Sequence, residues 1–94
     1  MKRMNHNRRR DVENIMKGAA NHRRLQILEL LSENPGLSGF DIAEMLKADF
    51  RTISQHTRRL ARAGLLTKQY EGRIVHHTLT SRGKNILTFC RMLE

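Results

Sequence analysis

The segment from Arg51 to Arg62 sorts its side chains onto two opposite faces when it is read as a helix. Polar and cationic residues recur along one stripe of the helical repeat of about 3.6 residues; they are Arg51, Gln55, Arg58 and Arg62. The opposite side carries Ile53, Thr57, Leu60 and Ala61. One face can therefore pack in a core while the other presents guanidinium and amide groups, which suit phosphates and base edges of DNA. An isolated stripe of this kind is also typical of a merely soluble helix, so the surrounding sequence has to decide.

The positive charge is unevenly distributed along the 94 residues, which carry a net charge of +9. Residues 1–10 have five basic side chains, and residues 50–94 have nine basic and two acidic ones. Residues 11–49 have four basic and seven acidic side chains. This segregation indicates a polyanionic partner for the two basic segments. A membrane surface is disfavoured as that partner, because the basic helix has no wide apolar face with Trp or Phe to insert into lipid.

The length fits a single domain with a modest core. No apolar run approaches about 18 residues, and the basic start has no apolar stretch behind it, so we expect neither a membrane span nor a secretory signal. The single cysteine, Cys90, cannot close a disulfide within the chain, which fits a reducing cytosol. We therefore expect a cytoplasmic domain over residues 11–94, preceded by a flexible basic arm over residues 1–10.

Cap residues and apolar periodicity predict the first three helices. Asp11 can cap a short helix, and Asn21 can cap a leucine-rich one that stops at Asn34-Pro35-Gly36. Ser38 and Asp41 form a capping-box pattern for a third helix, with Phe40, Ile42, Ala43 and Leu46 as its apolar positions.

The basic helix is expected over residues 49–63, with Asp49 as its cap and Gly64 at its end. The connection from the third helix is only three residues long, residues 47–49, and its last residue is the cap Asp49. Two short helices joined by so tight a connection form a helix-turn-helix unit, and here its second helix carries the basic face.

Two extended segments around Glu71-Gly72 predict a β-hairpin over residues 65–79. Val75, His77 and Leu79 should share one face of the second strand, because side chains alternate between the two faces. The tip of the hairpin is predicted to carry Lys68 and Arg73. A hairpin directly after a helix-turn-helix is called a wing. Thr80-Ser81 can then cap a last helix.

Four motifs in this order resemble those of ArsR-type transcriptional regulators. Residues 21–31 resemble the family's D-x-T-R-L-x-I-L-x-L-L helix, and residues 52–60 resemble its T-V-S-R-H-L-x-x-L helix. Residues 63–66 and 71–73 match its A-G-L-V and E-G-R motifs, and the spacing is ungapped through Thr80. The resemblance covers residues 11–93 and implies a mainly α winged helix-turn-helix with a small β-hairpin. MarR-type regulators share much of the pattern.

Two departures from that family pattern affect what the resemblance implies. Thr57 stands where the family usually has leucine, so the fourth helix packs more loosely or uses the threonine methyl group. The third-helix segment, residues 37–43, lacks the cysteines of metal-sensing members. No metal-sensing role therefore follows from the resemblance.

The resemblance implies a sequence-specific regulator of transcription, expected to repress, which places the basic helix in the major groove of double-stranded DNA. The residues assigned to DNA are Arg51, Thr52, Ser54, Gln55, Arg58, Arg59, Arg62, Lys68 and Arg73. Arg51, Thr52 and Gln55 lie nearest the entering end and are assigned to base edges. The arginines further along should hold phosphates, and the wing should contact the backbone or minor groove. The basic arm could follow the minor groove or backbone.

Family members pair through their first and last helices, which implies a homodimer. The residues assigned to that interface are Val12, Ile15, Met16, Ala19, Ile86, Leu87, Cys90 and Leu93. The alternative is that these apolar stripes only close the core of the monomer.

Other kinds of site have little support. No nucleophile–base constellation or cofactor motif is present, so we expect no enzyme, no cofactor and no small-molecule effector that the sequence can name. His76 and His77 would point to opposite faces of a strand and cannot easily chelate a metal together. Cys90 is either a small hydrophobe or a redox sensor. Non-specific DNA coating and protein docking remain the alternatives to site-specific regulation, and the ratio of operator to random-DNA affinity separates coating from regulation.

Overall fold

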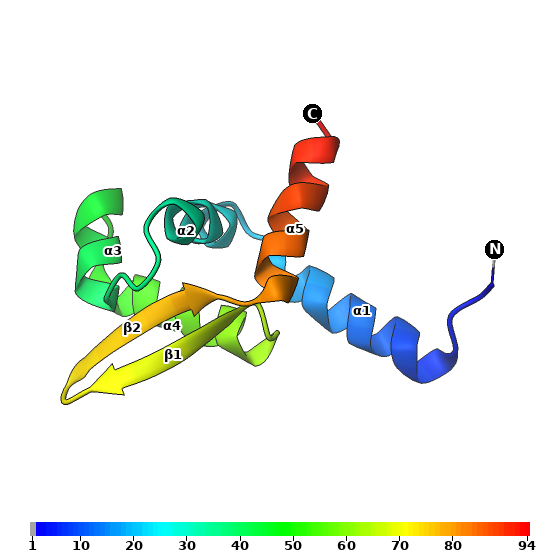
Figure 1. The fold of residues 1–94 in the computed structure, drawn as a ribbon, viewed down its shortest axis with the longest axis horizontal. Helices are drawn as coiled ribbons and strands as arrows, with labels where there is room; N and C mark the ends of the chain where they lie inside the picture. The colour runs from blue at the N-terminus through cyan, green and yellow to red at the C-terminus, as the bar shows by residue number, and fades with distance from the viewer. Residues whose placement is uncertain (1) are drawn as a thin grey trace.

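A computed structural model describes residues 2–94, which form five helices and one two-stranded hairpin (Figure 1). The helices are α1 (His6–Ala19), α2 (His22–Glu33), α3 (Gly39–Leu46), α4 (Phe50–Arg62) and α5 (Ser81–Met92), and the strands are β1 (Leu66–Glu71) and β2 (Ile74–Leu79). Figure 1 shows the hairpin extending to one side of the molecule and α1 to the other. This is the winged helix-turn-helix architecture that the sequence predicts.

The helices from α2 onward begin at the caps expected from the sequence. The side chains of Asn21, Asp49 and Thr80 each accept a hydrogen bond from a backbone N–H in the first turn of α2, α4 and α5. Ser38 and Asp41 form the predicted capping box of α3. Gly64 follows α4 with a φ of 76°, a left-handed conformation that glycine adopts without a steric penalty.

The start of α1 corrects the sequence prediction. The helix begins at His6, where the side chain of Asn5 accepts a hydrogen bond from the Arg8 N–H at 2.8 Å. Asp11 is therefore an exposed residue inside the helix and not its cap, and residues 6–10 are helical instead of part of a flexible arm. The reason is local, since Asn5 is a good cap and arginine is a good helix former, whereas apolar periodicity begins only at Val12. Met1 lies outside the described residues.

The core lies where α2 and α4 meet the base of the hairpin and the start of α5. Its fully buried members are Ile27, Leu28 and Leu31 of α2, Ile42 of α3, Ile53 and Leu60 of α4, and Leu65 before β1. Leu66, Leu79 and Leu87 close it on the hairpin and α5 side. The broad apolar stripe of α2 thus packs on several neighbours, as expected from its width.

The hairpin is antiparallel, with Leu66 opposite Leu79 at its base and Glu71 opposite Ile74 at its tip. The Gly72 φ of 62° closes the turn. Backbone hydrogen bonds of 2.9 Å, from Gly36 N to His77 O and from His77 N to Leu37 O, join β2 to the segment before α3. The wing is therefore fixed to the helix-turn-helix by main-chain pairing and not only by side-chain contacts.

Candidate nucleic-acid interface

The outer face of α4 is exposed and cationic. Arg51, Gln55, Arg58 and Arg62 are all exposed along it. On the opposite face Ile53 and Leu60 have no solvent exposure, and Thr57 is 1% exposed. The buried side chains hold the helix against the core and leave the predicted stripe facing outward.

Within residues 2–94, none of these arginines forms an ion pair with a carboxylate. The two ion pairs found within residues 2–94 join Lys17 to Glu13 and His76 to Glu71, and neither involves α4. The guanidinium groups of α4 are therefore free to bind an external anion, which is the condition that a DNA-reading helix has to meet.

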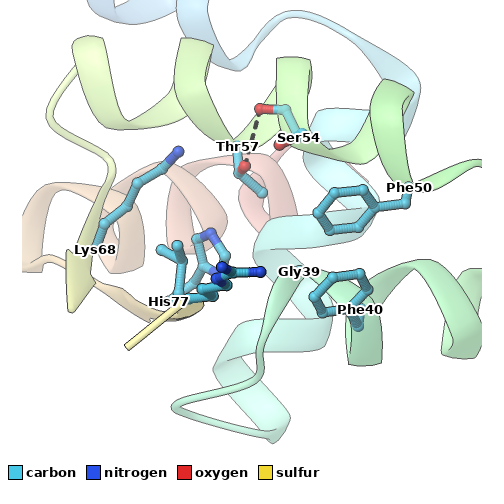
Figure 2. Close-up of a pocket in the computed structure, with 9 residues that line it drawn as sticks. Gly39, Phe40, Phe50, Ser54, Thr57, Lys68 and His77 are labelled. Carbon is cyan, nitrogen blue, oxygen red and sulfur yellow. Dashed lines mark hydrogen bonds between the residues drawn. The ribbon is translucent and has the colours of Figure 1, made fainter. Parts of the chain in front are cut away.

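Two residues predicted to contact DNA, Thr52 and Ser54, lie near the start of α4 but are engaged within the protein. The Thr52 hydroxyl donates to the carboxylate of Asp49 at 3.3 Å, and the Thr52 N–H donates to the same oxygen at 3.1 Å. Thr52 is exposed, but its hydroxyl proton serves the helix cap. Ser54 lies on the flank of α4 that faces the hairpin, where it lines a cavity beside Thr57 (Figure 2).

Lys68 is not at the tip of the wing, which corrects the sequence prediction. It lies in the middle of β1 opposite His77, and its side chain lines the cavity between the hairpin and α4 (Figure 2). Partial burial lowers the pKa of Lys68, and the nearby charge of Arg58 acts in the same direction. Arg73 is exposed at the turn, as predicted. The wing thus brings one cation beside α4 and one to its tip.

Two phenylalanines, one in the first turn of α3 and one in the first turn of α4, are exposed although the sequence did not predict it. Phe40, expected as an apolar core position, is 58% exposed, and Phe50 is 41% exposed. Their rings stack with centroids 4.3 Å apart, beside the cavity of about 270 Å³ between α4 and the hairpin (Figure 2). They lie in the first turns of α3 and α4, whose core-facing residues Ile42 and Ile53 are fully buried. Helical periodicity gave no signal for the exposure of Phe50, because this residue stands seven positions before Thr57 and so shares the apolar side of α4.

The C-terminal end of α1 and the apolar side of α5 line one shallow groove, and most of the residues predicted for the dimer interface are only partly buried. Val12, Ile15, Ile86 and Cys90 are half-buried, Met16 is exposed, and Leu93 is 70% exposed. Ala19 and Leu87 are buried within the monomer, so they fit the alternative in which the stripe closes its own core. Phe89 and Met92 of α5 are also exposed and were missed, because the predicted stripe was read as one narrow face.

Comparison with known proteins identifies the family. A family model described as winged helix-turn-helix DNA-binding matches residues 21–67, half of the chain. The chain belongs to this family. It is 39% identical over 67 residues to the transcriptional activator HlyU of Vibrio cholerae, a match that covers 71% of this chain and 61% of that protein.

Solved structures extend the likeness over nearly the whole winged helix chain. The structure of HlyU from Vibrio cholerae N16961 is 32% identical, covers 96% of this chain and 97% of that one, and has a TM-score of 0.81. A homodimeric winged helix-turn-helix domain from Mycobacterium bovis, described as a possible ArsR-family regulator, shares the fold with a TM-score of 0.83 at 23% identity. It covers 99% of this chain and 89% of that one. The predicted winged helix-turn-helix fold is confirmed.

The histidines of this winged helix protein occupy different surroundings. His77 is buried and directs Nδ1 to the Leu37 carbonyl oxygen at 3.0 Å, while His76 directs Nδ1 to the Gly36 carbonyl oxygen at 3.0 Å. Within the described part of the chain, no group of three or more His, Cys, Asp or Glu side chains is placed to hold a metal ion. Among residues 2–94 no helix is both long enough and apolar enough to cross a membrane.

Proposed function

We propose that the protein is a sequence-specific DNA-binding regulator of transcription that inserts the N-terminal half of α4 into the major groove. The observation that carries this proposal is the exposed stripe of α4, whose arginines have no acidic partner in residues 2–94 while Ile53, Thr57 and Leu60 on the opposite face are buried. A helix presented in this way fits the major groove, which is about 12 Å wide.

The position of each side chain on α4 suggests its role. Arg51 and Gln55 lie nearest the entering end, and their geometry suits guanine and adenine edges respectively. Arg58, Arg59 and Arg62 follow toward the C-terminal end and are assigned to phosphates. Ser54 and Thr52 lie on the two flanks of the stripe, where a phosphate or base edge is within reach of either side chain.

The wing supplies the second group of contacts. Arg73 at the tip reaches the backbone or minor groove, and Lys68 lies next to Arg58, at the junction of the wing with α4. Both contacts are sequence-independent, because a phosphate carries no base information. They therefore set the register of α4 on the duplex.

A homodimer is part of the same proposal. One short helix reads few bases, and a genome offers many competing sites, so a single copy would discriminate poorly. The exposed apolar side chains of Met16, Phe89, Met92 and Leu93 lie on α1 and α5, away from the α4 stripe. Pairing through them would bury this surface and place two α4 helices on successive half-sites.

Whether the protein represses or activates transcription does not follow from its DNA-binding surface. Repression was the expectation from the sequence, yet the curated Vibrio relative is named an activator. That match spans 61% of the relative's length, so the relative's activity is not transferred to this chain. A promoter–reporter assay with and without the protein decides between the two. We place this activity in the cytoplasm, where a bacterial-type regulator meets its DNA.

Selection of binding sites from random duplexes tests the proposal. We expect enrichment of a two-fold symmetric sequence with half-sites about 10 base pairs apart. The selected duplex should bind at least about 1,000-fold more tightly than a scrambled duplex at physiological salt. A ratio close to one would replace site-specific regulation with non-specific DNA coating. Absence of binding to any duplex would leave a protein-docking module.

A further inference from the structure

The flank of α4 that faces away from the hairpin carries a second group of cations. Ser54 shares a cavity with the hairpin residues Lys68 and Val75, whereas His56 contacts α2 and Arg59 approaches the end of α1. Arg23 and Arg24, in the first turn of α2, face them across this corner. We call these four residues, Arg23, Arg24, His56 and Arg59, the corner cluster.

Arg24 is the anchor of the corner cluster. Its Nε donates to the Gly18 carbonyl oxygen at 2.6 Å and its Nη2 donates to the Lys17 carbonyl oxygen at 3.2 Å. These carbonyls end α1, where the helix dipole is negative and a cation is stabilised. Its Nη1 lies 3.4 Å from Nδ1 of His56. The contacts of Arg24 with the end of α1 account for the position of Arg24 itself. They do not account for the other three cationic residues of the cluster.

Arg59 converges on the same point from α4. A Cβ atom built on Gly18 would come 3.2 Å from Nη1 of Arg59 and would overlap the Cβ of Ala63. Glycine at position 18 therefore allows α1 to approach α4 closely and lets the Arg59 guanidinium lie over the end of α1. Arg23 stands beside Arg24 with its Nη1 donating to the Gln26 side chain at 2.9 Å.

The corner cluster brings like charges together without a counter-charge. No carboxylate within residues 2–94 forms an ion pair with any of its members. Burial lowers the pKa of Arg24, with the charge of Arg59 acting in the same direction. Burial also lowers the pKa of His56, followed by the charges of Arg24 and Arg23. Such crowding costs free energy that an anion bound at the corner would offset.

We propose that the corner cluster is a phosphate-binding site that holds the DNA backbone on the edge of the major groove opposite the wing. This inference rests on the proposed function, since it assumes that α4 enters the groove. A helix in the major groove has a phosphate strand on each side. The wing cations serve one strand, and the corner cluster lies on the flank that meets the other. Of these four residues, only Arg59 is predicted from the sequence to contact DNA.

The arrangement also makes DNA binding depend on pH through His56. Among residues 2–94, the charged groups that act on His56 are Arg24 and Arg23 from α2, and the end of α1 contributes the Gly18 and Lys17 carbonyls that hold Arg24. A phosphate placed there favours the protonated imidazole, so the pKa of His56 rises on binding. The complex then takes up a proton, and affinity increases as the pH falls. A rise of about one pKa unit corresponds to as much as about a tenfold gain in affinity.

The test measures the affinity of a random-sequence duplex across a salt series, because phosphate contacts do not depend on sequence. Arg23→Gln removes a cation whose guanidinium donates a hydrogen bond to the Gln26 side chain of its own helix. We expect it to lower the slope of log affinity against log salt by about 0.9, the value for one phosphate. Arg73→Gln is the positive control at the wing, and Lys84→Gln, exposed on α5, is the matched negative control.

The second arm compares wild type with His56→Gln at pH 6 and pH 8. Wild type should gain affinity at pH 6 by more than the variant does, and the His56 imidazole signals should titrate at higher pH when the duplex is present. An unchanged salt slope in Arg23→Gln together with equal pH dependence in His56→Gln would overturn the corner site. If Arg73→Gln also left the slope unchanged, the proposed function itself would be wrong, so the two failures are distinguishable.

Discussion

His77 and Leu37 are joined by two hydrogen bonds to one carbonyl oxygen, 2.9 Å from the backbone nitrogen of His77 and 3.0 Å from its ring Nδ1. A carbonyl only accepts, so Nδ1 carries the proton in the neutral ring. The pair fixes the wing to the turn before α3, with the imidazole 2% exposed between β2 and α4. The orientation of the wing relative to α4 therefore depends on a neutral histidine.

This relationship predicts that the protein loses stability in mild acid. Burial lowers the pKa of His77, against the opposing effect of its Leu37 hydrogen bond. The unfolded chain therefore binds more protons below about pH 6.5, so stability is full above that value and falls as the pH drops toward the folded pKa. Urea unfolding at pH 5 to 8 should show this fall, and His77→Gln should flatten it.

His76 provides the control for that experiment. The hydrogen bond to the Gly36 carbonyl raises the pKa of His76, followed by the one to Glu71. Its contribution is present below about pH 6.5 and is lost as the pH rises through the folded pKa, which is the opposite sign. His76→Gln should therefore steepen the acid-side loss. Equal pH slopes in wild type and His77→Gln would contradict the assignment to His77.

Replacing Thr57 by a larger apolar residue should raise the stability of the fold. Its side chain is buried next to the cavity of about 270 Å³, and its hydroxyl donates to the Ser54 carbonyl at 3.1 Å (Figure 2). ArsR-type regulators usually have leucine here, and a longer side chain would extend toward the cavity. We expect Thr57→Leu to raise the free energy of unfolding by about 1 kcal/mol, measured by urea denaturation. Thr57→Val, which adds no length, should be nearly neutral, and a leucine variant less stable than the valine one would show that the cavity cannot accept it.

Replacing Arg51 and replacing Arg73 by alanine should change DNA affinity in different ways. Arg51→Ala should weaken binding to the selected site by about 1–3 kcal/mol, because it removes a base contact, and should change random-DNA binding little. Arg73→Ala should weaken both duplexes about equally and reduce the salt slope by roughly one unit. Titrations of both duplexes at several salt concentrations measure this. If Arg51→Ala altered neither affinity, the proposed docking of α4 would fail.

Leu93 tests the homodimer. Leu93→Glu places a charge on the exposed apolar surface of α1 and α5 without touching the core. We expect the dimer dissociation constant to rise at least about tenfold, equivalent to about 1.4 kcal/mol. Sedimentation across a range of concentrations measures it, and Met45→Glu, at another exposed apolar residue on α3, is the matched control. A wild-type protein that sediments as a monomer at micromolar concentration would count against pairing.

Features set by neighbours in the chain could be predicted from the sequence. The caps at Asn21, Asp49 and Thr80 act within one helical turn, so their residue types suffice to place them. The two faces of α4 follow from the helical period alone, which is why Arg51 and Leu60 lie where they were expected. One local signal was misread, since Asn5 and not Asp11 begins α1.

Features set by distant segments were decided only by the tertiary structure. Lys68 was expected at the wing tip, but the strand register places it opposite His77 and beside α4. The meeting of Arg24 with His56 joins residues 32 positions apart, and it requires α1 to end where α2 and α4 converge. The sequence by itself determined which helix carries the cations and which face it buries, because both depend on local periodicity. The fold alone decided which cations stand together, because that depends on how elements far apart in the chain pack.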